Sequence, residues 1–330
     1  MTKNVIQLGG LATAAVILAS SASAEIKVND NLSFGGYLVG SATITDLDNA
    51  STSSTMDMDA MKLITVAKFA PVTGTLSLWS GANADPVFLD AHVAYDAGNG
   101  VTITGGKFLS WLGYEAFDPV NMTQITYGWN TVPGGVAFIG IPAYHTGVKI
   151  ETSGEGYTAG FAVLDSNNYL TPVYKGDGRL DHGAGFEAYT TFKSGNFTTF
   201  VGAAYDKDDL ADLATMSGDI WVQYAAGANT FAFEFCYATL DPKTGSSTDS
   251  YFWLFFAKHV FSEKFALSGR VSGGVGDATP ADVEFIKGTI APAWTITPNL
   301  EIVGELSYVT YDGLGYDNGV FAGLQARFKF

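Results

Sequence analysis

Apolar and polar residues alternate along sixteen segments of this chain, and no other feature of the sequence limits its fold as strongly. Successive side chains of a β-strand point to opposite faces, so each segment would carry one apolar face and one polar face. In the last segment Val320, Leu324 and Phe328 fall on one side, whereas Gln325 and Arg327 fall on the other. The segments cover residues 32–44, 60–71, 74–80, 86–96, 100–109, 145–153, 156–164, 183–194, 197–205, 218–226, 230–239, 250–260, 265–275, 283–296, 299–310 and 319–330.

Segment lengths indicate that the chain crosses a membrane with strands. After residue 24 no stretch approaches the roughly 18 to 20 consecutive apolar residues of a spanning helix, whereas most segments reach the roughly 9 to 11 residues of a tilted spanning strand. Strands with one apolar and one polar face suit a barrel with lipid outside and water inside. We therefore predict an all-β fold, a transmembrane antiparallel up-and-down β-barrel of about 16 strands. Segment 250–260 is apolar on both faces, so its register stays open.

The connections between the segments alternate between short and long, which supports the same topology. An antiparallel barrel with both chain ends in the periplasm places every short turn on that side and every long loop outside. Composition alone also permits a secreted β-sandwich or solenoid, but a sandwich gives no reason for this alternation. The short turns are 71–74, 97–100, 153–156, 193–196, 227–229, 261–264 and 297–299. Aromatic residues predicted to form an inner girdle at these turns are Tyr157, Phe192, Phe197, Tyr224, Phe231, Phe265, Trp294 and Phe330.

Residues 1–24 are predicted to be a cleaved secretory signal. They hold one cation, Lys3, then an apolar run from Leu11 to Ala19, and end in an A-x-A type cleavage site. Residues 25–330 would then form a single outer-membrane barrel domain. Cys236 is the single cysteine, which excludes an intramolecular disulfide and a cysteine-based metal cluster. We accordingly predict neither a metal nor a cofactor.

Charge is distributed unevenly between the loops and the predicted wall. The long loops hold most of the 33 acidic residues and only four basic ones, Lys175, Arg179, Lys207 and Lys243. An acidic rim favours cations at the mouth of a pore, but acidic loops also solvate a surface or bridge divalent cations, and the sequence favours both interpretations equally. Alternation predicts that a set of charged side chains lines a watered channel: Asp90, Lys149, Glu151, Glu187, Glu234, Arg270, Lys287, Glu301, Glu305, Arg327 and Lys329.

The stretch 110–144 is the longest connection and is unusually apolar for a loop. It carries Trp111 and Tyr114 among several aromatic residues, but its only charges are Glu115 and Asp118. Loops longer than about 12 to 15 residues are usually functional or disordered, and this one would hide its aromatic side chains by folding into the lumen. We predict that it forms the constriction, with Lys107 at its base opposite the two acidic residues.

Motifs around this loop resemble a known family. Gly106–Phe108 ends the preceding strand, Leu112–Glu115 and Asn121 lie in the loop, and Ile141–Val148 begins the next strand. A Gly-Lys-Phe strand end, a Gly-Tyr-Glu loop and a Pro-x-x-His-Thr-Gly stretch are similar to the central pattern of the beta-barrel porin-2 family, also called OmpL-like. The resemblance covers about 45 residues. It implies an outer-membrane porin and names no substrate.

We expect a bacterial outer-membrane porin through which small hydrophilic solutes and ions diffuse passively, with a mild cation preference as a hypothesis. A structural or adhesive barrel with a plugged lumen is the alternative. A hydrolase is a weaker one, because the four histidines lie on separate segments and outside any recognised catalytic motif. Expected partners are outer-membrane lipids, the barrel-assembly machinery acting through Phe330, and the permeating solutes and ions. A homotrimer is left open, and no nucleic-acid partner is expected.

Deleting residues 116–140 should raise single-channel conductance, because a loop folded into the lumen narrows the pore. Planar-bilayer recording measures this directly. An unchanged conductance would place the constriction elsewhere.

Overall fold

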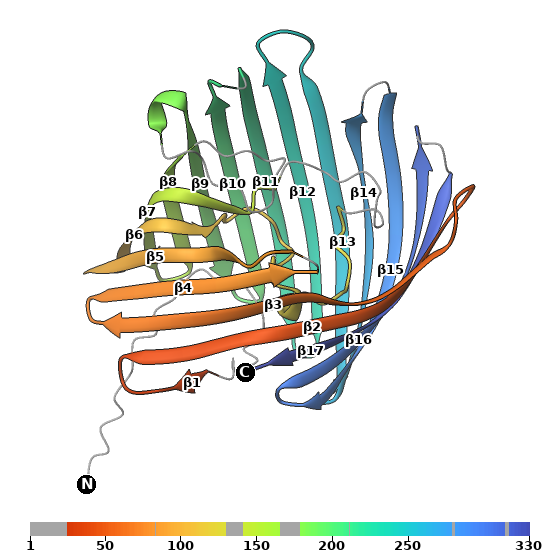
Figure 1. Cartoon of the computed structure of the whole chain (residues 1–330), viewed down its shortest axis with the longest axis horizontal. Helices are drawn as coiled ribbons and strands as arrows, with labels where there is room; N and C mark the ends of the chain where they lie inside the picture. The colour runs from red at the N-terminus through yellow and green to blue at the C-terminus, as the bar shows by residue number, and fades with distance from the viewer. Residues whose placement is uncertain are drawn as a thin grey trace.

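The computed structural model describes residues 25–330 except 83, 130–140, 166–178, 211, 279–280 and 314–316, so the predicted signal segment 1–24 lies outside the described residues. Seventeen strands form one sheet (Figure 1). The strands are β1 Ile26–Lys27, β2 Leu32–Leu47, β3 Ser53–Phe69, β4 Val72–Gly81, β5 Val87–Gly98, β6 Val101–Leu109, β7 Tyr144–Gly154, β8 Tyr157–Asp165, β9 Gly183–Ser194, β10 Phe197–Asp208, β11 Leu213–Ala226, β12 Asn229–Pro242, β13 Thr248–Ser262, β14 Phe265–Ala278, β15 Ala281–Thr297, β16 Leu300–Asp312 and β17 Asn318–Lys329. Two short 3-10 helices, η1 Pro119–Asn121 and η2 Leu180–His182, lie in loops.

Strands β2 to β17 form a closed antiparallel barrel. Each pairs with its neighbours along the chain, and the register of β17 on β2 runs from Gly319 opposite Leu47 to Lys329 opposite Tyr37. This closure confirms the predicted sixteen-strand barrel, and it pairs the edges that an open sheet would leave free. The added strand β1, which the alternation did not indicate, pairs with β2 at Ser33 and Phe34.

Alternation separates the two faces of the wall as predicted. On β12, Phe231 and Phe235 are 50% and 38% exposed on the outer face, whereas Glu234 and Cys236 are buried on the inner face. Rows of exposed large apolar side chains suit contact with lipid, not with water. No helix among the described residues is long and apolar enough to span a membrane.

The undecided register of 250–260 is resolved on β13. Tyr251 and Phe255 point outward and are exposed, whereas Phe252, Leu254 and Phe256 point inward and are buried. The inward row packs against residues of the loop after β6, namely Tyr114, Ile125, Trp129 and Ile141. This strand is apolar on both faces because lipid covers one face and the loop covers the other.

Short turns close one end of the barrel at all seven predicted places. The turn between β5 and β6 is Asn99-Gly100, whose φ values of 54° and 78° give the left-handed pair that a two-residue hairpin requires. A Cβ on Gly100 would lie 2.2 Å from the carbonyl oxygen of Ser153, so only glycine fits there. Girdle residues meet across neighbouring strands at this end, with 4.8 Å between the ring centroids of Phe197 and Tyr224.

Strand β3 starts earlier than predicted, at Ser53 instead of residue 60, and β4 is longer than the predicted 74–80. Residues 53–59 are mostly polar, so they show too little apolar alternation to be recognised as a strand. They are extended because they pair with β2, whose own strand continues to Leu47.

Candidate channel constriction

The described parts of the loop, residues 110–129 and 141–143, lie inside the barrel, and the Glu187 carboxylate on β9 holds the first end of the loop. Glu187 accepts hydrogen bonds from Ser110 Oγ at 2.9 Å and from the backbone N–H of Trp111 at 2.6 Å. His145, which follows the loop on β7, brings Nε2 to 3.6 Å from the same carboxylate. Ser110 N–H donates to the carbonyl oxygen of Ala143 at 2.7 Å. Glu187 therefore holds the start of the loop, and the hydrogen bond from Ser110 to Ala143 keeps the end of the loop beside it.

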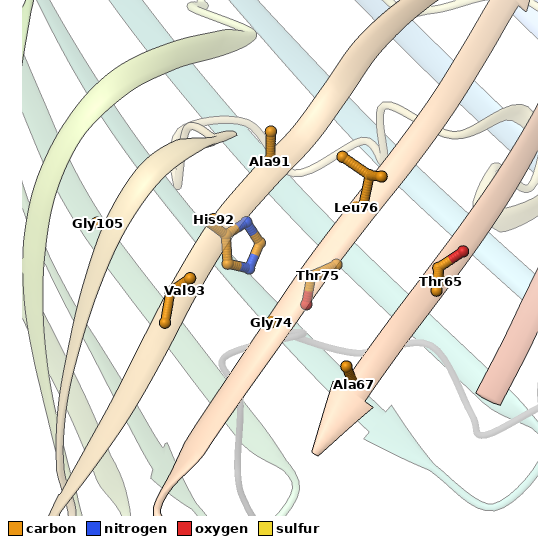
Figure 2. Close-up of a pocket in the computed structure, with 9 residues that line it drawn as sticks. All are labelled: Thr65, Ala67, Gly74, Thr75, Leu76, Ala91, His92, Val93 and Gly105. Carbon is orange, nitrogen blue, oxygen red and sulfur yellow. The ribbon is translucent and has the colours of Figure 1, made fainter. Parts of the chain in front are cut away.

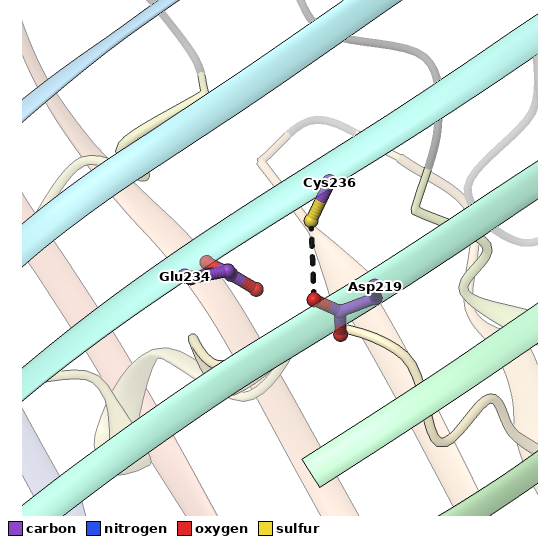
Figure 3. A group of neighbouring side chains, drawn as sticks. All are labelled: Asp219, Glu234 and Cys236. Carbon is purple, nitrogen blue, oxygen red and sulfur yellow. Dashed lines mark hydrogen bonds between the residues drawn. The ribbon is translucent and has the colours of Figure 1, made fainter. Parts of the chain in front are cut away.

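Two further acids of the wall accept the next free amides of the loop. The N–H of Gly113 donates to Asp219 on β11 at 2.7 Å, and the N–H of Tyr114 donates to Glu234 on β12 at 2.6 Å. The Cys236 thiol points at Asp219 with Glu234 beside it, and the sulfur lies 3.3 Å from the Asp219 oxygen (Figure 3). One possible metal-ligand atom of each of these three side chains lies within 4.8 Å of the other two. Carboxylate and thiolate groups are types of ligand that metal ions bind. Both carboxylates accept hydrogen bonds from loop amides, so their role is to hold the loop in place.

Basic side chains hold residues 122–127 of the loop through their carbonyl groups. Arg327 on β17 donates to the carbonyl oxygens of Met122 at 2.5 Å and Gln124 at 2.7 Å. Its nearest ion-pair partner is Glu301, at 3.5 Å. A hydrogen bond to a charged group contributes about 1.5–3 kcal/mol, so Arg327 alone gives this segment a substantial attachment.

Lys287 and Glu305 continue the attachment from β15 and β16. Glu305 accepts from the N–H groups of Ile125 at 2.6 Å and Thr126 at 3.0 Å. Lys287 Nζ donates to Thr126 Oγ1 at 2.7 Å and to the carbonyl oxygen of Tyr127 at 3.1 Å. Burial raises the pKa of the Tyr127 phenol well above its ordinary value, so that side chain stays neutral within the packed loop.

The acidic residues of the loop bind separate parts of the barrel wall. Glu115 pairs with Arg270 on β14 and accepts the N–H of Gly128 at 2.6 Å. Three residues further on, Asp118 pairs with Lys62 on β3 at 3.2 Å. Because the two contacts belong to strands on different sides of the interior, the segment between them crosses the lumen. Asp118 also accepts the hydroxyl of Tyr37 at 2.8 Å.

Six of the predicted channel-lining residues are buried beneath the loop: Glu187, Glu234, Arg270, Lys287, Glu305 and Arg327. Their side chains point inward as predicted, but the expectation that water solvates them is wrong. Burial of a charge costs several kcal/mol unless the group is paired and hydrogen-bonded, and the loop backbone supplies those bonds here. The remaining predicted residues Asp90, Lys149, Glu151, Glu301 and Lys329 keep partial exposure.

The predicted place of Lys107, opposite Glu115 and Asp118, is wrong. Lys107 follows Ile103 and Gly105 in the outward row of β6, whereas Thr104 and Phe108 form the buried inward row. Its ammonium donates to the carbonyl oxygen of Phe88 at 2.8 Å, on the neighbouring strand β5.

Lys62 and Asp219 are the cation and the acid that the sequence analysis missed. Lys62 binds Asp90 at 3.1 Å in addition to Asp118, and it is 4% exposed. Both missed residues occupy inward positions of their strands. Lys62 is in the same inward row of β3 as Ala60, and Asp219 is in the same inward row of β11 as Trp221. The alternation would have identified Asp219, but the sequence held no signal for the partners of either residue.

A partly exposed charged cluster lies next to the loop. Lys149 Nζ lies 4.8 Å from the ring centroids of both Phe108 and Trp111 and 3.2 Å from Glu151. Glu151 accepts Trp111 Nε1 at 3.0 Å and the Tyr189 hydroxyl at 3.1 Å. Each charged group of the cluster thus contacts at least two neighbouring side chains, and these contacts restrict where the group can lie.

A closed, lipid-facing antiparallel barrel whose interior is narrowed by a folded loop defines the class of outer-membrane porins. Residues 24–329 match the family model described as Putative beta-barrel porin-2, OmpL-like, and the chain belongs to this family. The family match confirms the resemblance suggested by the motifs of 106–148 and extends it to the whole barrel.

Solved structures share the fold at low sequence identity. The trimer form of OmpT from Vibrio cholerae matches with a TM-score of 0.64 at 12% identity, over 91% of this chain and 100% of that one. The anion-selective porin from Comamonas acidovorans gives 0.65 at 12% identity, over 91% and 99%. OmpF of Salmonella typhi, solved with daunomycin, gives 0.66 at 14% identity, over 93% and 100%. No curated protein sequence matches the chain. At these identities the structures show the barrel fold alone, and the family match supports its place in the bacterial outer membrane.

Replacing Arg327 by Met should loosen the loop, because the carbonyl groups of Met122 and Gln124 lose hydrogen bonds worth about 3–6 kcal/mol together. We expect larger and noisier single-channel currents in planar bilayers. Lys329→Met is the matched control, since it removes a cation from the same row of β17. Equal noise in the two variants would show that Arg327 does not hold the loop.

Proposed function

We propose that this porin is a passive diffusion channel for small hydrophilic solutes and that it prefers cations. The observation that carries the preference is the difference in exposure between the two signs of charge. The side chains of Arg270 and Arg327 are 0% exposed and that of Lys62 is 3% exposed. Those of Asp118 and Glu151 remain 19% and 18% exposed.

Burial changes what each charge contributes to a permeating ion. A cation covered by the loop is neutralised by the carbonyl groups and carboxylates that it binds, and little of its field reaches water. A carboxylate that keeps contact with water attracts counter-ions and raises their local concentration. Among the described charges at the loop, Lys149, 14% exposed, is the basic side chain that balances the accessible acids most directly. The acidic outer loops act in the same direction.

Two single substitutions should shift ion selectivity in opposite directions. Asp118→Asn removes an accessible negative charge and should lower the cation preference, whereas Lys149→Met removes the balancing positive charge and should raise it. Reversal potentials in a salt gradient measure both effects. Glu263→Gln, in a short turn far from the loop, serves as the control and should leave the potential unchanged. Anion selectivity of the unmodified protein would refute the proposal.

We also propose that the chain has no hydrolytic activity. Ser110, Glu187 and His145 lie together, but the acid sits between the serine and the histidine. A serine hydrolase needs the histidine next to the nucleophile so that it can accept the proton. All three side chains are buried, which also keeps a substrate away from them.

The loop's many wall contacts favour one second candidate, a barrel whose lumen is plugged and whose outer loops bind a partner. The two functions differ in one measurable property. A porin conducts ions in planar bilayers as the unmodified protein, and a plugged barrel conducts only after the loop is displaced.

We further propose that the barrel forms a homotrimer through the outer face of β3 to β6, and that outer-membrane lipids and the assembly machinery, acting at Phe330, are its other partners. A groove of about 390 Å³ crosses this face (Figure 2). Most of the side chains that line it are small, which lets a neighbouring barrel approach closely. The lining residues are Thr65, Ala67, Gly74, Thr75, Leu76, Ala91, His92, Val93 and Gly105.

Filling the groove should weaken the trimer. Gly105→Phe places a large ring in it, whereas Gly218→Phe adds the same ring to β11, where a Cβ meets no atom within 4 Å. Native molecular mass in mild detergent should fall to that of a monomer for the first variant only. A monomeric unmodified protein would contradict the proposal.

A further inference from the structure

Four lysines occupy inward positions of the wall near the end that the short turns close. On β17, for example, Lys329 follows Gln325 and Arg327 in the inward row, and both of these residues are buried. Short turns of an outer-membrane barrel face the periplasm, so the four side chains lie at the periplasmic mouth of the lumen. We call them the lysine ring: Lys68 on β3, Lys193 on β9, Lys258 on β13 and Lys329 on β17.

The lysine ring surrounds the lumen and is not confined to one part of the wall. Six strand steps lead from β3 to β9, four from β9 to β13, four from β13 to β17, and two from β17 through β2 back to β3. Figure 1 shows these strands distributed around the barrel. The positive charges therefore act together on an ion that enters the mouth, whichever side of the wall it approaches.

The loop that buries the other cations does not cover the lysine ring. On β13 the loop reaches Phe256, whose ring centroid lies 6.0 Å from that of Tyr114, and Lys258 is the next inward residue. Lys68 and Lys193 are exposed, and the other two lysines are partly exposed. Within the described part of the chain, none of the four ammonium groups forms an ion pair. These charges therefore act on ions in water.

Acidic residues at this end offset the lysine ring only in part. Asp96 accepts the N–H of Gly98 in its own turn at 2.8 Å, and Glu301 lies 3.5 Å from Arg327. The other acids of this end lie outside the wall strands, in turns or before β2: Glu25, Asp30, Glu155 and Glu263. The inner face of the wall is therefore positive at the periplasmic mouth.

The position and spacing of the lysine ring select the kind of ligand. Inward side chains meet solutes in the lumen, whereas the phosphate groups of membrane lipids lie outside the barrel. An ammonium group is a compact charge with three donors, which suits phosphate and carboxylate oxygens. Because the four lysines belong to strands several steps apart, a small monovalent anion contacts one of them at a time. A multivalent anion is attracted by several at once, so it binds more strongly.

We propose that the lysine ring is a binding site for soluble multivalent anions, such as polyphosphates or polycarboxylates, at the periplasmic mouth. The accessible carboxylates of Asp118 and Glu151 at the loop oppose passage of the bound anion, and the acidic outer loops repel anions from the other mouth. A multivalent anion therefore occupies the mouth from the periplasm without crossing, and it blocks the current from that side only. The one-sided block rests on the proposed channel function, whereas the binding does not.

Inorganic tripolyphosphate is the probe, and titration calorimetry on the purified full-length barrel in detergent measures its binding at about 50 mM salt, where charges are weakly screened. The double variant Lys193→Gln, Lys258→Gln should weaken binding at least about fivefold, because it removes two of the attracting charges. The double variant Lys207→Gln, Lys243→Gln is the matched control. It removes two lysines at the opposite end of the barrel, 58% and 71% exposed, changes the net charge equally, and should bind as the unmodified protein does. An equal loss in both variants, or the absence of binding, would overturn the proposal.

Single-channel recording in planar bilayers tests the sidedness of the block. Tripolyphosphate in one compartment should lower the current, and the same concentration in the other compartment should leave it unchanged. The Lys193→Gln, Lys258→Gln variant should lose this block, and the control variant should keep it. Equal block from both compartments would overturn the proposed one-sided site. Lysine-dependent binding by a barrel that conducts no ions would support the binding site and refute the channel function.

Discussion

The interior of this barrel depends on hydrogen bonds between charged wall side chains and the backbone of one loop. A loop without regular secondary structure carries amide and carbonyl groups that cannot be buried unpaired. Acids on β9, β11 and β12 accept its first amides, and bases on β14, β15 and β17 donate to its later carbonyl groups. The wall charges would be equally costly to bury without the loop. Each set therefore requires the other, and the folded loop and the charged wall are one structural unit.

This mutual burial determines which charges a solute meets. In a simple barrel every inward charge would face water, and the two signs would nearly cancel. The loop removes most of the basic side chains from that surface, because guanidinium and ammonium groups suit the carbonyl groups of residues 122–127. The acids that bind amides are buried too, but Asp118 and Glu151 retain access to water. The sign of the accessible charge is thus a consequence of how the loop is held.

The sequence predicted the barrel well because the barrel is built from local alternation and short turns. A strand that is apolar on both faces, 250–260, was also informative, since its second apolar row is the surface on which the loop packs. Lys107 was misplaced because one step along a strand reverses the face of a side chain. The burial of Arg327 could not be predicted, because its partner Met122 lies 205 residues away and contributes a backbone atom, which carries no sequence signal.

Closure of the barrel also limits where a strand edge can stay unpaired. Within the membrane an unpaired edge would leave backbone groups in hydrocarbon, and the pairing of β17 with β2 removes that cost. Outside the membrane water satisfies the same groups, so a hairpin can outgrow its neighbour without penalty. Residues 53–59 are such a continuation, since 53–58 pair with β2 whereas the pairing of β3 with β4 begins only at Ala60.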